Sequence, residues 1–308
     1  MPTHPMRADD EHTVMRDVFI SHVGNMIEND PRLALVLADI SAGEGRFAQI
    51  VREHPDRIIN VGIREQLMIG TAGGLGLTGL RPIAHSYAPF LIERAFEQIK
   101  LDLEHQGTSA VLVSVGASYD WAEGGYTHFS PRDIGLLDSI GDWRIHTPGH
   151  PDEVPAALTS AVDSDRNAYL RLSLQENQQP HHTAAGKLSV LKRGRAATVV
   201  AVGTTLDNVL TATADMDVTV AYTNTPRPFD TETLRQLSSD DIVIVEPYQA
   251  GSSDWIINSA LRDRPHRLLS LGVGRNDLNR YGTSADHDWW HGLDAAGIAG
   301  SIKRFLAL

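Results

Sequence analysis

The sequence predicts an α/β fold of two mainly parallel-sheet domains, and three features of the chain lead to that prediction. Short runs rich in β-branched residues alternate with amphipathic stretches long enough for helices, which is the pattern of strand–helix–strand units. Around residues 175–188 the composition becomes polar and is broken by Pro180 and Gly186, as in a linker. A second alternation of the same kind then begins.

The first domain is expected at residues 14–176, after a flexible N-terminal arm at residues 1–13. Its amphipathic stretches predict helices that include 16–28 and 90–103. The Gly-rich stretch near residues 70–79 indicates the packing of a helix. The apolar residues after it lead to the end of a further strand. The other strands are predicted at residues 33–38, 58–61, 110–115, 144–147 and 169–172.

The second domain is expected at residues 191–308, after a linker at residues 177–190. The last helix is predicted at 295–306, with Asp294 as its cap, because a side-chain oxygen at that position accepts an otherwise unpaired backbone N–H. The strands of this domain are predicted at residues 197–202, 218–222, 241–245 and 267–270.

Bulk properties exclude several classes of protein. The 308 residues carry a formal net charge of −12, which argues against unaided binding to nucleic acid or anionic membranes but not against an anionic substrate. The absence of cysteine excludes disulfides, thiolate metal sites and a cysteine nucleophile. No apolar run approaches the roughly 20 residues of a membrane helix, and the polar start is unlike a signal peptide, so a cytoplasmic location is expected.

Residues 58–98 carry most of the chemical information. A β-branched run ends at Gly62, a helix-like stretch opens around Glu65, and the next strand leads to an aromatic pair, Tyr87 and Phe90. Ligands of open α/β sheets bind beyond the carboxyl ends of the strands. A carboxylate at the mouth of one strand and aromatic rings at the mouth of the next therefore suit a flat heterocycle.

This segment closely resembles the pyrimidine-binding domain of the transketolase family of thiamine diphosphate enzymes. Residues 62–66 match the family pattern G-[IV]-x-E-[QFH], residues 86–90 match S/T-[FY]-x-x-F, and residues 94–98 match R-A-[FY]-[DE]-Q. The resemblance extends over nearly the whole chain. It implies a pyrimidine domain of the thiamine diphosphate-binding fold, followed by a transketolase-like C-terminal domain with a structural role and no catalytic residues.

The resemblance also implies the residues that bind the cofactor. Glu65 matches the acid that holds N1′ of the pyrimidine and so activates the cofactor, because a buried carboxyl group stabilises the required tautomer. Phe90 matches the aromatic residue that stacks on the pyrimidine, and Tyr87 would lie near the same ring. The plainer alternatives are a glutamate that complements a helix dipole and two aromatic residues of the core.

Four further matches complete the expected site, which includes no metal ligand from this chain. Glu123 and His128 fit the family loop that places its histidine beside the donor sugar, where an imidazole can move protons near neutral pH. Asp39 matches the aspartate of an A-D-[LI]-x-x-S element in the cofactor half. Arg16 lies where many relatives have an arginine near the substrate entrance. The alternatives are a loop histidine bonded to backbone, a loop-capping aspartate and a surface arginine.

The chain departs from phosphosugar transketolases at positions that contact the sugar. A family histidine is replaced by Gly116, an aspartate by Gly124, a serine by Gly43 and an arginine by Leu174. Arg171 lies close enough in sequence to compensate, unless strand alternation turns it to the other face. The cofactor half of the pattern is intact and the substrate half is altered.

The pattern G-D-G, which the family uses to hold Mg²⁺ and the diphosphate, does not occur in the sequence. The resemblance therefore implies the second subunit of a split enzyme. An N-terminal diphosphate-binding transketolase subunit would supply the diphosphate site and most of the Mg²⁺ ligands. An α₂β₂ assembly is expected, with thiamine diphosphate across the interface between the two kinds of subunit.

The favoured function is transfer of a two-carbon ketol unit from a ketose donor to an aldehyde acceptor, possible only with the partner subunit. The alternative is a decarboxylating relative, similar to the β subunit of 2-oxo acid dehydrogenases or to deoxyxylulose-phosphate synthase. A third interpretation is a non-catalytic scaffold or regulatory subunit. Intact matches at Glu65, Phe90 and His128 argue against that third interpretation.

Overall fold

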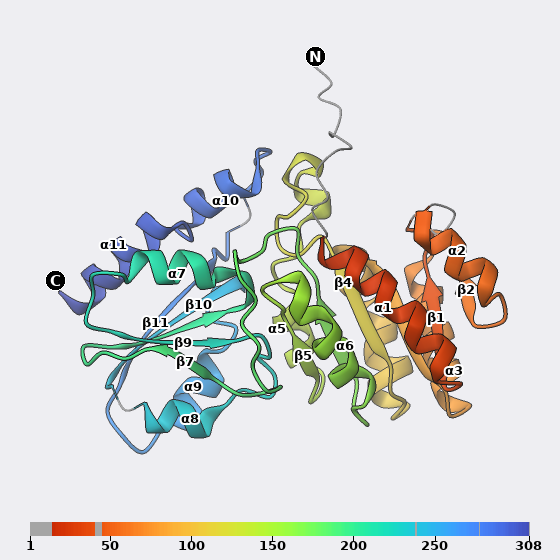
Figure 1. Cartoon of the computed structure of the whole chain (residues 1–308), viewed down its shortest axis with the longest axis horizontal. Helices are drawn as coiled ribbons and strands as arrows, with labels where there is room; N and C mark the ends of the chain where they lie inside the picture. The colour runs from red at the N-terminus through yellow and green to blue at the C-terminus, as the bar shows by residue number, and fades with distance from the viewer. Residues whose placement is uncertain (1–13, 41–44, 238, 277, 308) are drawn as a thin grey trace, which may run out of the picture.

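The computed structural model describes residues 14–40, 45–237, 239–276 and 278–307. The predicted arm at residues 1–13 and the departure at Gly43 lie outside these ranges. Two α/β units lie side by side in Figure 1, each built on its own sheet. The predicted fold class, two mainly parallel-sheet α/β units, is confirmed.

The first sheet contains, within the described residues, six parallel strands in the order β2-β1-β3-β4-β6-β5. The strand that follows the Gly-rich stretch is β3, at the centre of the sheet. Nearly every residue of the central strands is buried, because helices cover both faces of the sheet. The strands are β1 Leu33–Leu37, β2 Ile58–Asn60, β3 Arg81–Tyr87, β4 Val111–Val115, β5 Arg144–His146 and β6 Ala168–Arg171.

Alternate residues of these strands face opposite helical layers. Leu35 packs in a cluster with residues of α1, α2 and α6, whereas its neighbour Val36 packs with residues of α3 and of the helical segment after β3. The two segments that carry Glu65 and Phe90 therefore cover the same face. The helices are α1 Met15–Asn29, α2 Gly45–Glu53, α3 Glu65–Leu77, α5 Asp133–Asp138 and α6 Val154–Val162.

The prediction of a single helix at residues 90–103 is wrong in the type of helix. The chain there forms a π-helix η1 at Pro89–Arg94, one short α-helical turn α4 at Phe96–Gln98, and a second π-helix η2 at Ile99–His105. A π turn holds one more residue than an α turn, so it changes which side chains share a face. Apolar periodicity alone could not show this difference.

The second sheet has the order β11-β10-β8-β9-β7 in the described chain, with only β7 antiparallel. The sequence prediction lacked β7, which begins inside the predicted linker. The structure does not test the domain boundaries themselves. The strands are β7 Ser189–Lys192, β8 Thr198–Val202, β9 Thr219–Thr223, β10 Asp241–Gln249 and β11 Arg267–Val273.

Helices cover both faces of the second sheet (Figure 1): α7, α10 and α11 on one face, and α8 and α9 on the other. The Asp294 side chain accepts the Gly297 N–H at 3.2 Å, as predicted for the cap of α11. The helices are α7 Leu206–Ala212, α8 Thr231–Gln236, α9 Asp254–Ala260, α10 Ser284–His291 and α11 Ala295–Leu306, with 3₁₀ turns at η3 Ala122–Gly124, η4 Tyr126–His128, η5 Pro151–Glu153 and η6 Gly203–Thr205.

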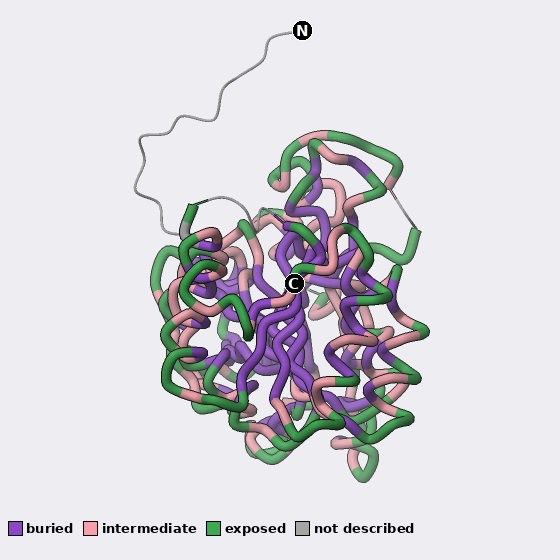
Figure 2. The backbone as a smooth tube through the Cα atoms, turned by 90° about the vertical axis from the view of Figure 1, so that its right-hand side faces the viewer, coloured by how far each residue is buried: buried purple, intermediate pink, exposed green. Residues whose placement is uncertain are grey.

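The two units are joined by buried contacts. Ile145 donates its backbone N–H to the Arg227 carbonyl at 2.9 Å, and the Arg227 guanidinium pairs with Asp138. Buried Glu153 accepts from the Tyr222 hydroxyl at 2.8 Å. Figure 2 shows buried backbone in the middle of the molecule, and one apolar cluster contains residues of both sheets. The second unit is therefore held firmly enough to support loops of the first.

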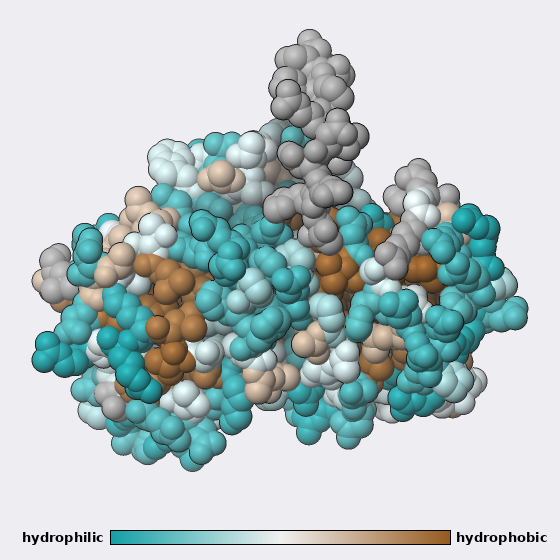
Figure 3. Space-filling view, in the orientation of Figure 1, coloured by the Kyte–Doolittle hydropathy of each residue, from teal (hydrophilic) through white to brown (hydrophobic). Residues whose placement is uncertain are grey.

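The face shown in Figure 3 is mostly hydrophilic, with a hydrophobic strip around the strands labelled β7 and β9 in Figure 1. Within the described residues no helix is long and apolar enough to cross a membrane.

Candidate functional site

Four ring side chains meet beyond the carboxyl ends of β3 and β4. The His128 ring lies 5.3 Å from Phe90 and 6.4 Å from Tyr87, measured between ring centroids. Trp121 lies 5.0 Å from His128 and 5.1 Å from Tyr87. We call these four residues, Tyr87, Phe90, Trp121 and His128, the aromatic cluster. Three of its members were predicted from the sequence, and Trp121 was not.

Glycines allow the loop after β4 to return over β3. Gly116 and Gly125 have φ values of +73° and +68°, which other residues rarely adopt. A Cβ on Gly116 would lie 3.2 Å from the Tyr87 ring, and one on Gly124 would lie 3.0 Å from His128 Nδ1. The two positions that lack the family's polar side chains are therefore packed directly against the aromatic cluster.

Glu65 lies at the first position of α3 and is 2% exposed. Arg94 Nη1 donates to its carboxylate at 2.8 Å, and the same guanidinium lies 4.0 Å from the centre of the Phe90 ring. Arg94 therefore connects the predicted acid to the predicted stacking ring. A flat heterocycle that used both groups would take the position of this guanidinium.

Arg16 and Asp39 form a separate corner at the end of β1. The Asp39 backbone N–H and the Gly62 N–H both donate to the Asn60 side chain at 3.0 Å. Arg16 donates to the Ile40 carbonyl at 2.8 Å. Arg16 also lies 5.3 Å from the centre of the Phe47 ring on α2. In the described part of the chain, these contacts of Arg16 and Asp39 do not include a member of the aromatic cluster.

The remaining predicted residue, Glu123, lies on the same returning loop as His128. Glu123 is exposed on η3, between Trp121 and His128 in sequence. The Thr127 hydroxyl and His128 Nδ1 lie within hydrogen-bond distance, 3.0 Å apart. This contact leaves Nε2 as the ring nitrogen that can serve a ligand.

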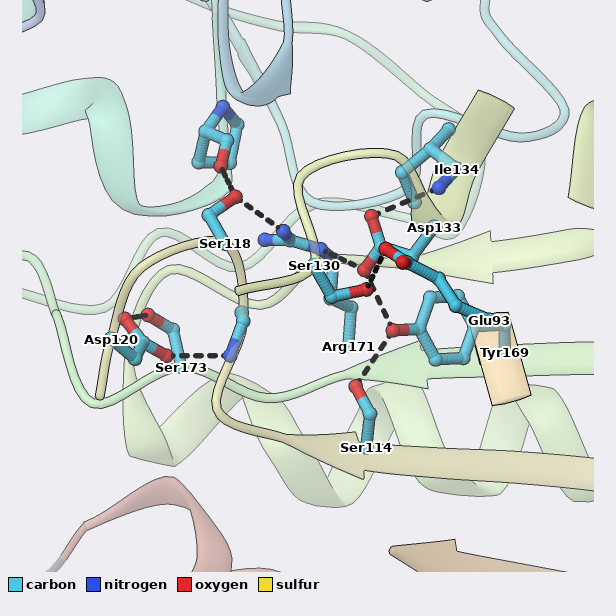
Figure 4. Close-up of polar contacts among 12 residues, drawn as sticks. Glu93, Ser114, Ser118, Asp120, Ser130, Asp133, Ile134, Tyr169, Arg171 and Ser173 are labelled. Atoms are coloured by element: carbon cyan, nitrogen blue, oxygen red, sulfur yellow. Dashed lines mark hydrogen bonds and ion pairs between the residues drawn. The ribbon is translucent and has the colours of Figure 1, made fainter. Parts of the chain in front are cut away.

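Arg171 does not compensate for the arginine missing at Leu174. It is 3% exposed, and it donates to Asp133 at 2.6 Å and to the Ser118 hydroxyl at 2.6 Å within a buried network (Figure 4). The Tyr169 hydroxyl donates to the same Asp133 carboxylate. The charge of Arg171 is therefore used inside the protein, in the buried pair with Asp133.

Asp120 ties the returning loop to the segment after β6. Its carboxylate accepts the backbone N–H groups of Ala117 and Leu174 and the Ser173 hydroxyl, each at 2.9 Å. Burial raises the pKa of Asp120 from its ordinary value of 3.8 to about 6. This carboxylate holds Leu174 beside the loop that carries Trp121.

The second unit also holds the returning loop, through helix α10. The Tyr119 hydroxyl donates to Asp288 at 2.5 Å, and the Tyr119 ring stacks against His287 at 5.0 Å and His291 at 5.5 Å. The Tyr281 ring lies against Gly125. Sequence reasoning missed these residues because nothing in their local pattern relates them to a loop so distant in the chain.

No group of three or more His, Cys, Asp or Glu side chains that could hold a metal ion occurs in the described ranges. Glu65, Phe90 and Tyr87 nevertheless fit the pyrimidine ring of thiamine diphosphate. Glu65 offers a buried carboxyl group, and Phe90 offers a ring face already covered by a planar cation.

Comparison with known proteins gives the family. Residues 12–179 match the family described as transketolase, pyrimidine binding domain. A 33.6 kDa uncharacterized protein in the fasciation locus of Rhodococcoides fascians is 47% identical, with 96% of each chain covered. One of the subunits of the apulose-4-phosphate transketolase of Actinobacillus succinogenes is 30% identical, over 92% of this chain and 94% of that protein.

Longer relatives and solved structures agree with this match. A 1-deoxy-D-xylulose-5-phosphate synthase of Thermotoga petrophila is 27% identical, and the chain spans 48% of its length. A split-gene transketolase, solved as an inactive beta4 tetramer, has the same fold with a TM-score of 0.81 at 22% identity, covering 96% of this chain and 98% of that one. The match over more than half of the chain and the two full-length relatives show that this protein belongs to the transketolase family and carries its pyrimidine-binding domain.

Proposed function

We propose that this chain is the pyrimidine-binding subunit of a two-chain, thiamine diphosphate-dependent transketolase. The observation that carries the proposal is the buried Glu65 carboxylate at the start of α3, connected through one displaceable guanidinium to the Phe90 ring. A carboxyl group and an aromatic face so placed can hold a pyrimidine by one hydrogen bond and one stacking contact. The chain would transfer a two-carbon ketol unit from a ketose donor to an aldehyde acceptor.

The residues of this chain would bind and orient the cofactor. When bound, thiamine diphosphate supplies the carbon nucleophile that breaks and forms bonds beside a carbonyl group. Glu65 would hydrogen-bond N1′, Phe90 would stack on the pyrimidine, and Tyr87 would support Phe90 from the side, where their rings already meet edge to face at 6.2 Å. Asp39 is proposed to contact the cofactor from the neighbouring strand end.

His128 would move protons on and off substrate hydroxyl groups. Its ring is part of the aromatic cluster and half-buried, and its Nδ1 contacts Thr127, so Nε2 is the atom that would accept or donate the proton. Arg16 and Glu123 are proposed to contact the substrate from the entrance. Both of these contacts with the substrate would depend on how a partner subunit closes the site.

A partner subunit would complete the site. The described residues contain no metal-ligand cluster, and the sequence contains no G-D-G, so the diphosphate and Mg²⁺ require ligands from elsewhere. The relative from Actinobacillus succinogenes, itself one subunit of a transketolase, has almost the same length as this chain. We propose an α₂β₂ assembly in the cytoplasm, with an obligate interface that buries more than about 2,000 Å².

The experiment mixes the chain with its partner, thiamine diphosphate and Mg²⁺, and follows conversion of D-xylulose and glycolaldehyde into glyceraldehyde and erythrulose. Transfer that requires both chains and the cofactor supports the proposal. Equal transfer without added cofactor, after removal of any bound cofactor, would refute it. A decarboxylating function is the second candidate, since the chain matches half of a 1-deoxy-D-xylulose-5-phosphate synthase. Release of carbon dioxide from pyruvate, without ketol transfer, would favour it.

A further inference from the structure

Given the proposed function, on which this step rests, we infer that the substrate side of the site takes an uncharged aldehyde with a flat apolar group. The geometry points to Trp121 as the residue that recognises this group. Three observations lead there: an apolar wall beside His128, small residues where polar side chains would reach the substrate, and a local charge unsuited to phosphate.

The apolar wall is made by exposed side chains next to the proton-transferring histidine. Trp121 is 40% exposed although its ring lies 5.0 Å from His128, so part of the indole is open to a ligand. Tyr126, two residues before His128 on η4, is 44% exposed, and Leu174, whose backbone N–H is held by Asp120, is 55% exposed. An indole face beside a reacting carbonyl stabilises a flat apolar group through burial and offset stacking.

The wall is built and held in place by the fold. Asp120, next to Trp121, accepts the Leu174 N–H at 2.9 Å and the Ala117 N–H at 2.9 Å. Tyr119 is fixed by Asp288 of helix α10. The indole is therefore presented by an anchored loop, and its position beside His128 does not depend on a ligand to order it.

The glycines beside the aromatic cluster leave no side chain for a polar contact. A Cβ on Gly116 would lie 3.2 Å from the Tyr87 ring, and the backbone there has a φ of +73°. A Cβ on Gly124 would lie 3.0 Å from His128. Because both positions are packed against rings, neither offers a polar side chain to the substrate. Trp121 and His128 are then the main residues that would contact it.

The local charge is unfavourable to a phosphate group. Arg171 is held by Asp133 in a buried pair and Arg132 donates to the Tyr126 hydroxyl, while Arg94 pairs with Glu65 until the cofactor takes its place. The carboxylate of Glu123 is exposed on the loop between Trp121 and His128. A phosphate dianion would lose hydration here, would have to break the buried Arg171–Asp133 pair to gain that guanidinium, and would lie near the Glu123 carboxylate.

The reaction balances without an oxidant or reductant. The C2–C3 bond of the ketose donor breaks, and the remainder of the donor leaves as an aldehyde after its C3 hydroxyl loses a proton. The two-carbon ketol unit forms a new carbon–carbon bond to the aldehyde carbon of the acceptor, whose oxygen takes up one proton. His128 is placed to carry that proton.

The test compares three acceptors in the reconstituted two-chain enzyme with D-xylulose as donor: benzaldehyde, glycolaldehyde and glyceraldehyde 3-phosphate. We expect benzaldehyde to have the highest kcat/KM. Trp121→Ala should lower kcat/KM for benzaldehyde about tenfold more than it lowers kcat/KM for glycolaldehyde. Trp121→Phe should retain most of the benzaldehyde rate. Trp255→Ala, at a tryptophan of helix α9 that is 62% exposed, is the matched control and should change neither rate.

A binding measurement completes the test without turnover. Benzyl alcohol, an unreactive neutral analogue, should inhibit the parent and Trp121→Phe more strongly than Trp121→Ala. If glyceraldehyde 3-phosphate is the best acceptor, or if Trp121→Ala lowers all three rates equally, the inference is overturned while the proposed function stands. If no acceptor is used, the proposed function fails and the inference fails with it.

Discussion

The guanidinium of Arg94 joins Glu65 and lies over Phe90, with 2.8 Å from Nη1 to the carboxylate and 4.0 Å from the guanidinium carbon to the ring centre. These are the two groups that would hold a pyrimidine ring. A pyrimidine held by both groups, as proposed, would occupy the same space as this side chain, so its binding would move Arg94. The π-helical winding of η1 brings the guanidinium to this position.

Replacing Arg94 by Ala should tighten binding of thiamine diphosphate to the two-chain enzyme. The ion pair that the cofactor must break is then absent, and since Arg94 is 39% exposed we expect only about a three- to tenfold gain in affinity. Titration calorimetry measures the dissociation constant. Arg94→Lys should give a smaller change, and Lys100→Ala, which is 52% exposed on η2, should give none. Weaker binding by Arg94→Ala would show that this residue holds the cofactor.

Tyr119→Phe should loosen the loop that carries Trp121 and His128. The variant removes the hydroxyl that donates to Asp288 at 2.5 Å, and it leaves that half-buried carboxylate with one partner fewer. We expect a loss of about 1–3 kcal/mol in the free energy of unfolding and a lower kcat. Denaturant titration and steady-state kinetics measure the two effects. An unchanged stability would mean that α10 does not support the loop through this bond.

The buried Asp120 predicts a specific pH dependence of stability. Burial raises its pKa from 3.8 to about 6, so the folded protein binds a proton more readily than the unfolded chain. This contribution to the free energy of unfolding is complete below pH 3.8 and is lost as the pH rises to about 6. Asp120→Asn cannot titrate, so its stability relative to the parent should improve over that window by up to about 3 kcal/mol. Denaturation curves measured at several pH values give this difference. A difference in the free energy of unfolding between Asp120→Asn and the parent that stays constant across the window would contradict the assignment.

A partner should cover the apolar surface around Glu65. Ile63 and Leu67 flank this buried carboxylate and are 71% and 50% exposed. Ile63→Arg should weaken assembly with the partner chain about tenfold or more, because it would place a charge in an apolar contact. Leu77→Arg, at the other end of α3 and 64% exposed in the parent, is the control. Analytical ultracentrifugation of the mixed chains measures both, and equal behaviour of the two variants would place the interface elsewhere.

Short-range sequence patterns predicted the features that depend only on residues close together in the chain. The run of strands and helices, the Asp294 cap and the positions of Tyr87, Phe90 and His128 follow from periodicity and short motifs. Edge strand β7 was missed because four half-exposed residues show no clear alternation. The partners of Arg171 and Tyr119 could not be predicted because each bond joins residues far apart in the chain, Tyr119 and Asp288 by 169 positions.

The role of Trp121 illustrates the same limit. Its sequence neighbours place it on a loop, but only the fold brings its ring to Tyr87 and His128. The departures at Gly116 and Gly124 were visible in the sequence. Their meaning depends on the rings against which they pack, which are supplied by other segments.

Glu65 of this chain is proposed to activate thiamine diphosphate bound between two subunits. The most direct test is the rate at which the thiazolium C2 proton of the cofactor exchanges with deuterium, measured by quenched-flow and NMR without any substrate. The parent chain with its partner should accelerate exchange by at least about a hundredfold over free cofactor, and Glu65→Gln should lose most of that acceleration while the complex still assembles. Exchange by the Glu65→Gln enzyme at the parent rate would contradict the account.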